Sequence, residues 1–129
     1  MANARPAGQG SPLIWALFSM RGRISRQVYW LAYVLFVSVN GVIVGQLFGG
    51  DEASFSRIAE TLGPFVILAT IYSNVAVTVK RLHDVGYSGF LAVAMFVPLV
   101  NLVFTIWAGI IPGTLGPNAY GDVPDRAPA

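Results

Sequence analysis

Three long stretches of the chain contain no charged residue, and most of their positions are apolar. They run from Gln27 to Gly50, from Thr61 to Val79 and from Val85 to Gly121. A helix needs about 20 mostly apolar residues to cross a hydrocarbon core about 30 Å thick, and each stretch contains such a run. The pattern therefore predicts an all-α integral membrane bundle of three transmembrane helices.

The predicted spans extend from about Val28 to Phe48, from Leu62 to Val79 and from Phe90 to Ile111. At 1.5 Å per residue the first span reaches about 31 Å, which matches one bilayer core. Gly49 to Glu60 is expected to be a polar loop. Pro98 lies inside the third span, where its missing N–H predicts a kink.

The residues before the first span divide into a polar tail and a short helix. Residues 1–10 are rich in Gly, Pro and Ala without an apolar run, which predicts a disordered tail. Ser11-Pro12 is a helix-start signal, and the apolar turn after it is too short to span. Arginines follow at once, so we expect a short interfacial helix. The membrane-embedded domain is placed at 11–122, followed by a flexible C-terminal tail at 123–129.

Basic residues are distributed unequally around the predicted spans. Most flank one side, namely Arg21, Arg23, Arg26, Lys80 and Arg81, whereas Arg57 lies alone between the first two spans. Because cytoplasmic loops are enriched in Lys and Arg, the N-terminus is predicted to be cytoplasmic. Three full spans would place the C-terminus outside. A re-entrant third segment that turns at Pro98 would return it to the cytoplasm, and both topologies remain open.

Composition narrows the classes of function. Hydrophobic residues make up 55% of the chain and charged residues 11%, and the net charge is +2. We attribute this charge to membrane topology, so no nucleic-acid partner is expected. The chain has no cysteine and a single histidine, His83, and it contains no phosphate-loop, zinc-protease or dinucleotide motif. We therefore expect no catalytic residue, no cofactor and no metal site, and a protein that is not an enzyme.

One face of the first span is lined by small residues. Ser38, Gly41 and Gly45 recur at three- and four-residue spacing, which places them on one helix face and predicts close helix packing. Asn40 lies on nearly the opposite face. We expect one of these faces to pack within the chain and the other between copies in a homo-oligomer.

Each predicted span contains one asparagine: Asn40, Asn74 and Asn101. The first hypothesis is that these side chains form hydrogen bonds that hold helices together. The alternative is a pathway for a small polar solute through an oligomeric transporter or channel. No ionisable residue lies within a span, and proton-coupled transporters usually need one.

Asp84 follows the second span directly and is surrounded by basic residues. An ion pair with Arg23 or Arg26 is expected, because an acid among cations is stabilised by pairing. Alternatively, the basic residues contact anionic lipid headgroups or an acidic protein partner. The residues expected to do so are Arg21, Arg23, Arg26, Lys80 and Arg81. His83 precedes Asp84, but adjacent helix positions point about 100° apart, which disfavours acid–base catalysis.

Several short motifs occur in order along the chain. They are Phe18-Ser19, Gly22-Arg23, Arg26 and Tyr29-Trp30; Arg81-Leu82-His83-Asp84 with Gly86 and Ser88-Gly89; Pro98-Leu99-Val100; and Gly113-Thr114 with Gly116, Asn118 and Tyr120-Gly121. Over about Trp15 to Asp122 the chain resembles family 805 of the domains of unknown function, small bacterial inner-membrane proteins. The resemblance implies a location and a fold but no activity.

The family's polar motifs lie at the N-terminus, the second loop and the C-terminal tail. Motifs that work together should share one side of the membrane, which favours the re-entrant topology more than the residue count does, while three membrane helices remain the prediction. The leading hypothesis for function is a non-enzymatic structural or docking module whose basic cytoplasmic face contacts anionic lipid or a protein partner. The alternative is the oligomeric transporter or channel component.

Overall fold

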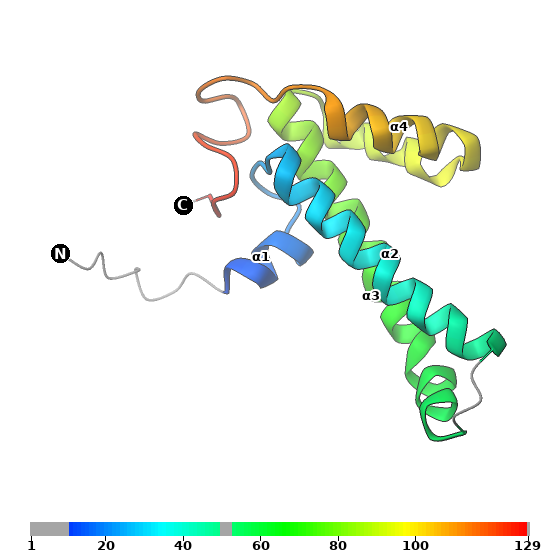
Figure 1. The fold of residues 1–129 in the computed structure, drawn as a ribbon. Coiled ribbons are helices and arrows are strands. Elements are labelled where there is room, and N and C mark those ends of the chain that lie inside the picture. The colour runs from blue at the N-terminus through cyan, green and yellow to red at the C-terminus, as the bar shows by residue number, and fades with distance from the viewer. Residues whose placement is uncertain (1–10, 50–52, 129) are drawn as a thin grey trace.

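The computed structural model describes residues 11–49 and 53–128, and every regular element within them is helical (Figure 1). The elements are α1 (Pro12–Phe18), α2 (Arg26–Gly49), α3 (Ala53–Val85), the 3₁₀ helix η1 (Gly89–Phe96) and α4 (Pro98–Ile110). The all-α prediction is confirmed for this part of the chain. The tail predicted at residues 1–10 lies outside the described residues.

Two long apolar helices, α2 and α3, lie side by side as an antiparallel hairpin (Figure 1). Arg26–Phe48 and Arg57–Val85 are each long and apolar enough to cross a membrane. The loop predicted from Gly49 to Glu60 is wrong for most of its length, because α2 includes Gly49 and α3 already begins at Ala53. Pro64 thus lies inside α3 instead of at its start. A longer helix lets the backbone form its hydrogen bonds internally near the apolar core.

The predicted third span, Phe90 to Ile111, is not one transmembrane helix. It folds as a hairpin of η1 and α4 that turns at Val97, whose backbone is extended (φ −98, ψ 113). Pro98 causes the break, because proline disfavours a helical conformation at the preceding residue and itself suits the first position of a new helix. At 1.5 Å per residue α4 is about 20 Å long, too short for a bilayer core of about 30 Å.

The hairpin returns the chain to the end of α3, as the re-entrant alternative requires (Figure 1). Gly86 ends α3 in the left-handed conformation at φ +92, as expected for a helix stop. The N–H of Thr114 then donates to the carbonyl of Asp84 at 2.7 Å. The segments that flank the membrane helices therefore meet at one end of the molecule.

The C-terminal segment is held against the residues between α1 and α2. The N–H of Asp125 donates to the carbonyl of Arg23 at 2.9 Å, and an Asp125 carboxylate oxygen accepts from the N–H of Ser25 at 2.8 Å. Arg23 and Arg126 form an isolated antiparallel bridge. The residues 123–128, expected to be a flexible tail, are thus docked, because backbone pairing secures them.

The return of the chain through η1 and α4 predicts that Ser88 and Ala127 lie on the same side of the membrane and Ser54 on the other. The chain has no cysteine, so a single introduced cysteine is the only site for a thiol reagent. In intact cells an impermeant maleimide should label Ser54→Cys and spare Ser88→Cys and Ala127→Cys. After permeabilisation all three should react. Labelling of Ala127→Cys but not Ser88→Cys in intact cells would instead show a third span.

Candidate functional site

Asp84, in the last turn of α3, pairs with two arginines at once. Its Oδ1 accepts from Nε of Arg23 at 3.0 Å, and its Oδ2 accepts from Nη1 of Arg81 at 2.5 Å. The side chains of Arg23 and Arg81 are 1% and 0% exposed. A buried charge is tolerated only when it is paired and hydrogen-bonded, so these groups depend on each other.

Arg26 does not join this ion pair. The predicted pair with Arg23 is present, whereas Arg26 is exposed and its Nη1 donates to the carbonyl of Ile110 at 3.4 Å. Arg26 begins α2, where it reaches the last carbonyls of α4. Arg81 is the second partner of Asp84; the sequence placed it among the surrounding basic residues without singling it out, although its three-residue spacing from Asp84 on one helix face is a signal for pairing.

Arg23 also organises the C-terminal turns. Its Nη1 donates to the carbonyls of Gly116 at 2.7 Å and Gly121 at 3.0 Å, and its Nη2 donates to the carbonyl of Thr114 at 2.7 Å. A planar guanidinium carries five donors in a fixed fork, so one side chain can satisfy several carbonyls. Arg23 therefore links the segment before α2 to residues roughly ninety positions later.

Gly113 lets the backbone approach the carboxylate of Asp84. A Cβ built at Gly113 would lie 2.0 Å from Oδ2 of Asp84 and 2.8 Å from its Cγ. Atoms at such separations overlap, so any side chain at this position would push the tail away from α3. The glycine of the Gly113-Thr114 motif is thus required by the close packing of the tail against the ion pair.

Lys80 and Arg81 donate hydrogen bonds to the free carbonyls at the C-terminal ends of α1 and α4, respectively. Nζ of Lys80 donates to the carbonyls of Trp15, at 3.0 Å, and of Ala16 and Ser19. Arg81 donates to the carbonyls of Ala108, at 2.8 Å, and Ile111. The last carbonyls of a helix have no partner within it and carry partial negative charge, so cations are favoured there.

We call Arg23, Lys80, Arg81 and Asp84 the charge cluster. All four residues are buried, and the three cations outnumber the acid. Backbone carbonyls provide the remaining acceptors, and they belong to Trp15, Ala16, Ser19, Ile24, Ala108, Ile111, Thr114, Gly116 and Gly121. The cluster therefore joins α1, α3, α4 and the C-terminal segment.

This burial corrects the expected set of lipid or partner contacts. Arg23, Lys80 and Arg81 donate their hydrogen bonds to the protein itself, and water or lipid does not reach them. Only Arg21 and Arg26 of that set are exposed at the surface. The sequence could not separate these two groups, because burial of an arginine depends on which carbonyls the fold brings to it.

His83 contacts the other side of the N-terminal segment. Its Nδ1 lies 3.2 Å from the carbonyl oxygen of Gly22, and its ring stacks on Tyr120 with centroids 3.9 Å apart and planes at 3°. Asn118 donates to the carbonyl of His83 at 2.8 Å. Within residues 11–49 and 53–128, no group of three or more His, Cys, Asp or Glu residues is arranged to hold a metal ion.

The three asparagines have separate local environments. Asn40 donates to the carbonyl of Phe36 and to the hydroxyl of Thr70 at 3.0 Å, so it links α2 to α3. Asn101 accepts from the hydroxyl of Thr105, one turn later in α4. Asn74 is half-buried on α3. Asn40 thus links two helices as the sequence predicted, whereas the hydrogen bond between Asn101 and Thr105 stays within α4.

Among the described residues, no other helix packs against the predicted face of Ser38, Gly41 and Gly45. A Cβ added at Gly41 or Gly45 would meet no atom within 4 Å, and Ser38 is exposed. We expected one face of α2 to pack within the chain and the other between copies. The face that carries Asn40 is the one that packs within the chain. The small-residue face is left open on the outside.

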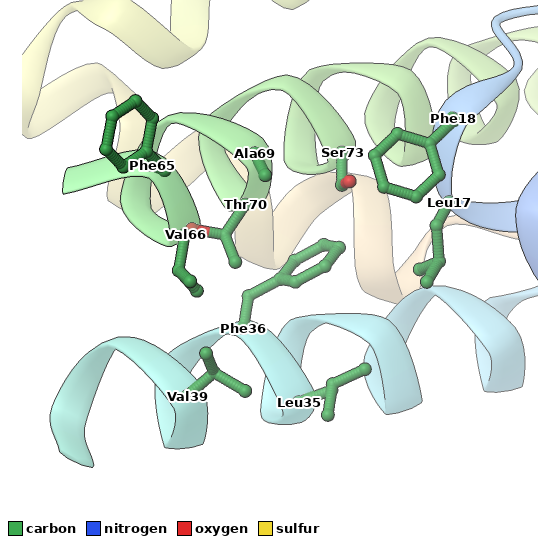
Figure 2. A pocket seen from close by; sticks show the side chains of 10 residues that line it. All are labelled: Leu17, Phe18, Leu35, Phe36, Val39, Phe65, Val66, Ala69, Thr70 and Ser73. Atoms are coloured by element: carbon green, nitrogen blue, oxygen red, sulfur yellow. The ribbon is translucent and has the colours of Figure 1, made fainter. Parts of the chain in front are cut away.

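An apolar groove of about 320 Å³ lies between α1, α2 and α3 (Figure 2). Figure 2 shows Phe36 of α2 directed toward the facing helix α3, with Leu17 and Phe18 of α1 at one end. The only hydroxyls in its wall belong to Thr70 and Ser73, and Thr70 already bonds to Asn40. The groove offers apolar contact and no free charged group.

The charge cluster predicts strong coupling between Asp84 and Arg23. Asp84→Asn should lower the free energy of unfolding by about 3 kcal/mol, since it leaves two buried arginines without their counter-ion. Arg23→Gln should cost about 1–3 kcal/mol less in the Asp84→Asn background than in the natural chain. Arg26→Gln, the matched control outside the pair, should be additive within about 0.5 kcal/mol. Reversible unfolding in mixed detergent micelles measures all these variants, and additive losses for Arg23 would contradict the pairing.

Comparison of the sequence with known proteins places the chain in a family. No solved structure matches the chain. The chain is similar to the inner membrane protein YhaI of Escherichia coli K12, at 32% identity over 80% of this chain and 83% of the relative. It is also similar to the uncharacterized protein YiiR (32%, 81% and 85%) and the inner membrane protein YhaH (28%, 84% and 88%) of the same strain. Residues 17–122, which contain the entire charge cluster, match the model of the protein family of unknown function DUF805, and the chain belongs to that family.

Proposed function

We propose that this protein is a non-enzymatic module of the bacterial inner membrane, which docks membrane components through a basic face on the cytoplasmic side. The observation that supports this proposal is that the buried charges bind only to other parts of the chain, whereas two arginines beside them remain exposed. Every charged atom of the Arg23–Asp84–Arg81 group contacts another part of the chain, so the group serves the architecture. The remaining basic residues at this end, Arg21 and Arg26, face outward.

The orientation follows from charge. Lys and Arg residues concentrate at the end where α1, the C-terminal end of α3 and the tail meet, and Arg57 belongs to the other end of α3. The positive-inside rule assigns the basic end to the cytoplasm. Arg21 and Arg26 would then meet the anionic headgroups of the inner leaflet, each contributing about 1 kcal/mol.

The transport hypothesis gains no support from the asparagines. Asn40 and Asn101 bond to neighbours in their own helix or in the adjacent one. None of the three lines the groove between α1, α2 and α3, a second apolar groove on α4 between Leu99 and Trp107, or a cavity between α3 and η1. A solute pathway needs polar groups that face a shared space, so the docking hypothesis accounts better for these residues.

The open small-residue face supports self-association as part of the docking role. In lipid, helices associate where small residues let their backbones approach closely. Ser38, Gly41 and Gly45 offer such a face on α2, and the intramolecular contact of α2 through Asn40 lies on nearly the opposite side.

If Arg21 and Arg26 contact anionic headgroups, replacing either one should weaken the binding of anionic lipid and leave the binding of zwitterionic lipid unchanged. In nanodiscs, quenching of tryptophan fluorescence by brominated phosphatidylglycerol should weaken in Arg21→Gln and in Arg26→Gln, with the relative affinity falling about fivefold in each. Quenching by brominated phosphatidylethanolamine should stay constant. Arg57→Gln is the matched control, with the same charge change at the other end of α3. Equal loss in all three variants would show a general charge effect and contradict a basic docking face.

If the small-residue face mediates self-association, Gly45→Leu should weaken the dimer and leave the stability of the monomer unchanged. A Cβ at Gly45 would have no atom of the described residues within 4 Å, so the melting temperature of the monomer should change little. The dimer fraction in mild detergent, measured by light scattering after size exclusion, should fall. Leu31→Ala, at an exposed position outside the stripe, is the control. A natural protein that is monomeric at every concentration would contradict this part of the proposal.

A further inference from the structure

A cavity of about 400 Å³ lies between α3 and η1, next to the charge cluster. On α3 its wall is formed by Val75, Val79 and His83, which share one helix face because they are four residues apart. Apolar residues of η1 close the other side, namely Phe90, Ala92, Val93 and Phe96. The cavity thus has a polar end at His83 and an apolar wall that extends about 12 Å along α3.

The polar end presents a free hydrogen-bond acceptor. Nδ1 of His83 lies 3.2 Å from the carbonyl oxygen of Gly22, and a carbonyl only accepts, so Nδ1 holds the proton. In the neutral ring Nε2 is then an acceptor. Nε2 lies 3.1 Å from the point where a Cβ of Gly89, a wall residue, would be. Among the hydrogen bonds of the described residues, none reaches Nε2.

A cation lies near this acceptor, because Lys80, three residues before His83 on α3, interacts electrostatically with its ring. Met20 forms part of the cavity wall, and Arg21, which is exposed, follows Met20 in the sequence. Asp84 is the acid nearest in sequence, and both of its carboxylate oxygens already accept from arginines. A ligand that suits this end has a negative charge and a hydrogen-bond donor, whereas an ammonium donor would add a further positive charge.

The apolar end of the cavity opens at the exposed surface of η1. The side chains of Val93 and Phe96 line the cavity and are 64% and 65% exposed. Hydroxyls of Ser88 and Tyr120 lie with His83 at the wall, so polar groups gather at one end and apolar groups at the other. This amphipathic gradient matches a lipid that stands at the membrane interface.

We propose that the cavity binds one anionic phospholipid with a hydroxyl-bearing headgroup. A headgroup hydroxyl donates to Nε2 of His83, the phosphate lies near Arg21, and part of an acyl chain lies between α3 and η1. The site deepens the proposed contact with anionic lipid, because a defined cavity and an unpaired ring nitrogen select one headgroup. It requires the membrane location of the chain and shares Arg21 with the basic face, so it rests on that part of the proposed function.

Native mass spectrometry of the delipidated protein in detergent tests the headgroup assignment. Phosphatidylglycerol should bind about fivefold more tightly than phosphatidylmethanol with the same chains, because the two have equal charge and only the first has headgroup hydroxyls. In His83→Phe, which keeps an aromatic ring next to Tyr120, the two lipids should bind equally. Equal binding to the natural protein would overturn the assignment.

A second pair of variants tests the cavity itself. Val93→Trp places a large side chain at the opening and should weaken phosphatidylglycerol binding at least about fivefold. Leu31→Trp makes a similar change at an exposed position on α2 that lines none of the described cavities, and it should bind like the natural chain. Equal binding by the two variants would overturn the site. Arg21→Gln together with Arg26→Gln should weaken both anionic lipids and preserve their ratio, which separates this site from the basic face.

Discussion

The fold depends on the requirement that a charge removed from water must find partners. Arg23, Lys80, Arg81 and Asp84 are all buried, and a single acid cannot balance three cations. The balance comes from backbone carbonyls, above all those at the C-terminal ends of α1 and α4, which have no partner within their own helices. The cations and the helix ends therefore satisfy each other, and removal of either leaves an unpaired polar group in a dry environment.

This mutual dependence explains why distant parts of the chain meet at one end. The N-terminal segment contributes Arg23, the end of α3 contributes Asp84, and the tail contributes carbonyls and the close approach of Gly113. The re-entrant hairpin is what makes the meeting possible, because a third full span would carry the tail to the opposite end. Helix breaking at Pro98 and ion pairing at Asp84 are thus two parts of one arrangement.

The rest of the molecule is an apolar exterior with local polar features. Along α2 and α3 many large apolar side chains are exposed, as expected where lipid replaces water as the solvent. Polar contacts away from the charge cluster are few and specific, such as the bond between Asn40 and Thr70. Function is therefore best sought at the basic end, where exposed arginines, the amphipathic cavity and the ordered tail occur together.

The order of apolar and charged residues was sufficient to predict an all-α membrane protein and the extent of α2, because hydrophobic length is a local property. It also predicted an ion pair of Asp84 with Arg23 or Arg26, and the structure shows the pair with Arg23. Family motifs pointed to the return of the tail. Burial of Lys80 and Arg81, the docking of residues 123–128 and the open face at Gly41 were decided only by the tertiary structure. An arginine or a glycine has the same local signal in either environment, and only the carbonyls and side chains brought near it from elsewhere in the chain determine whether it is buried or exposed.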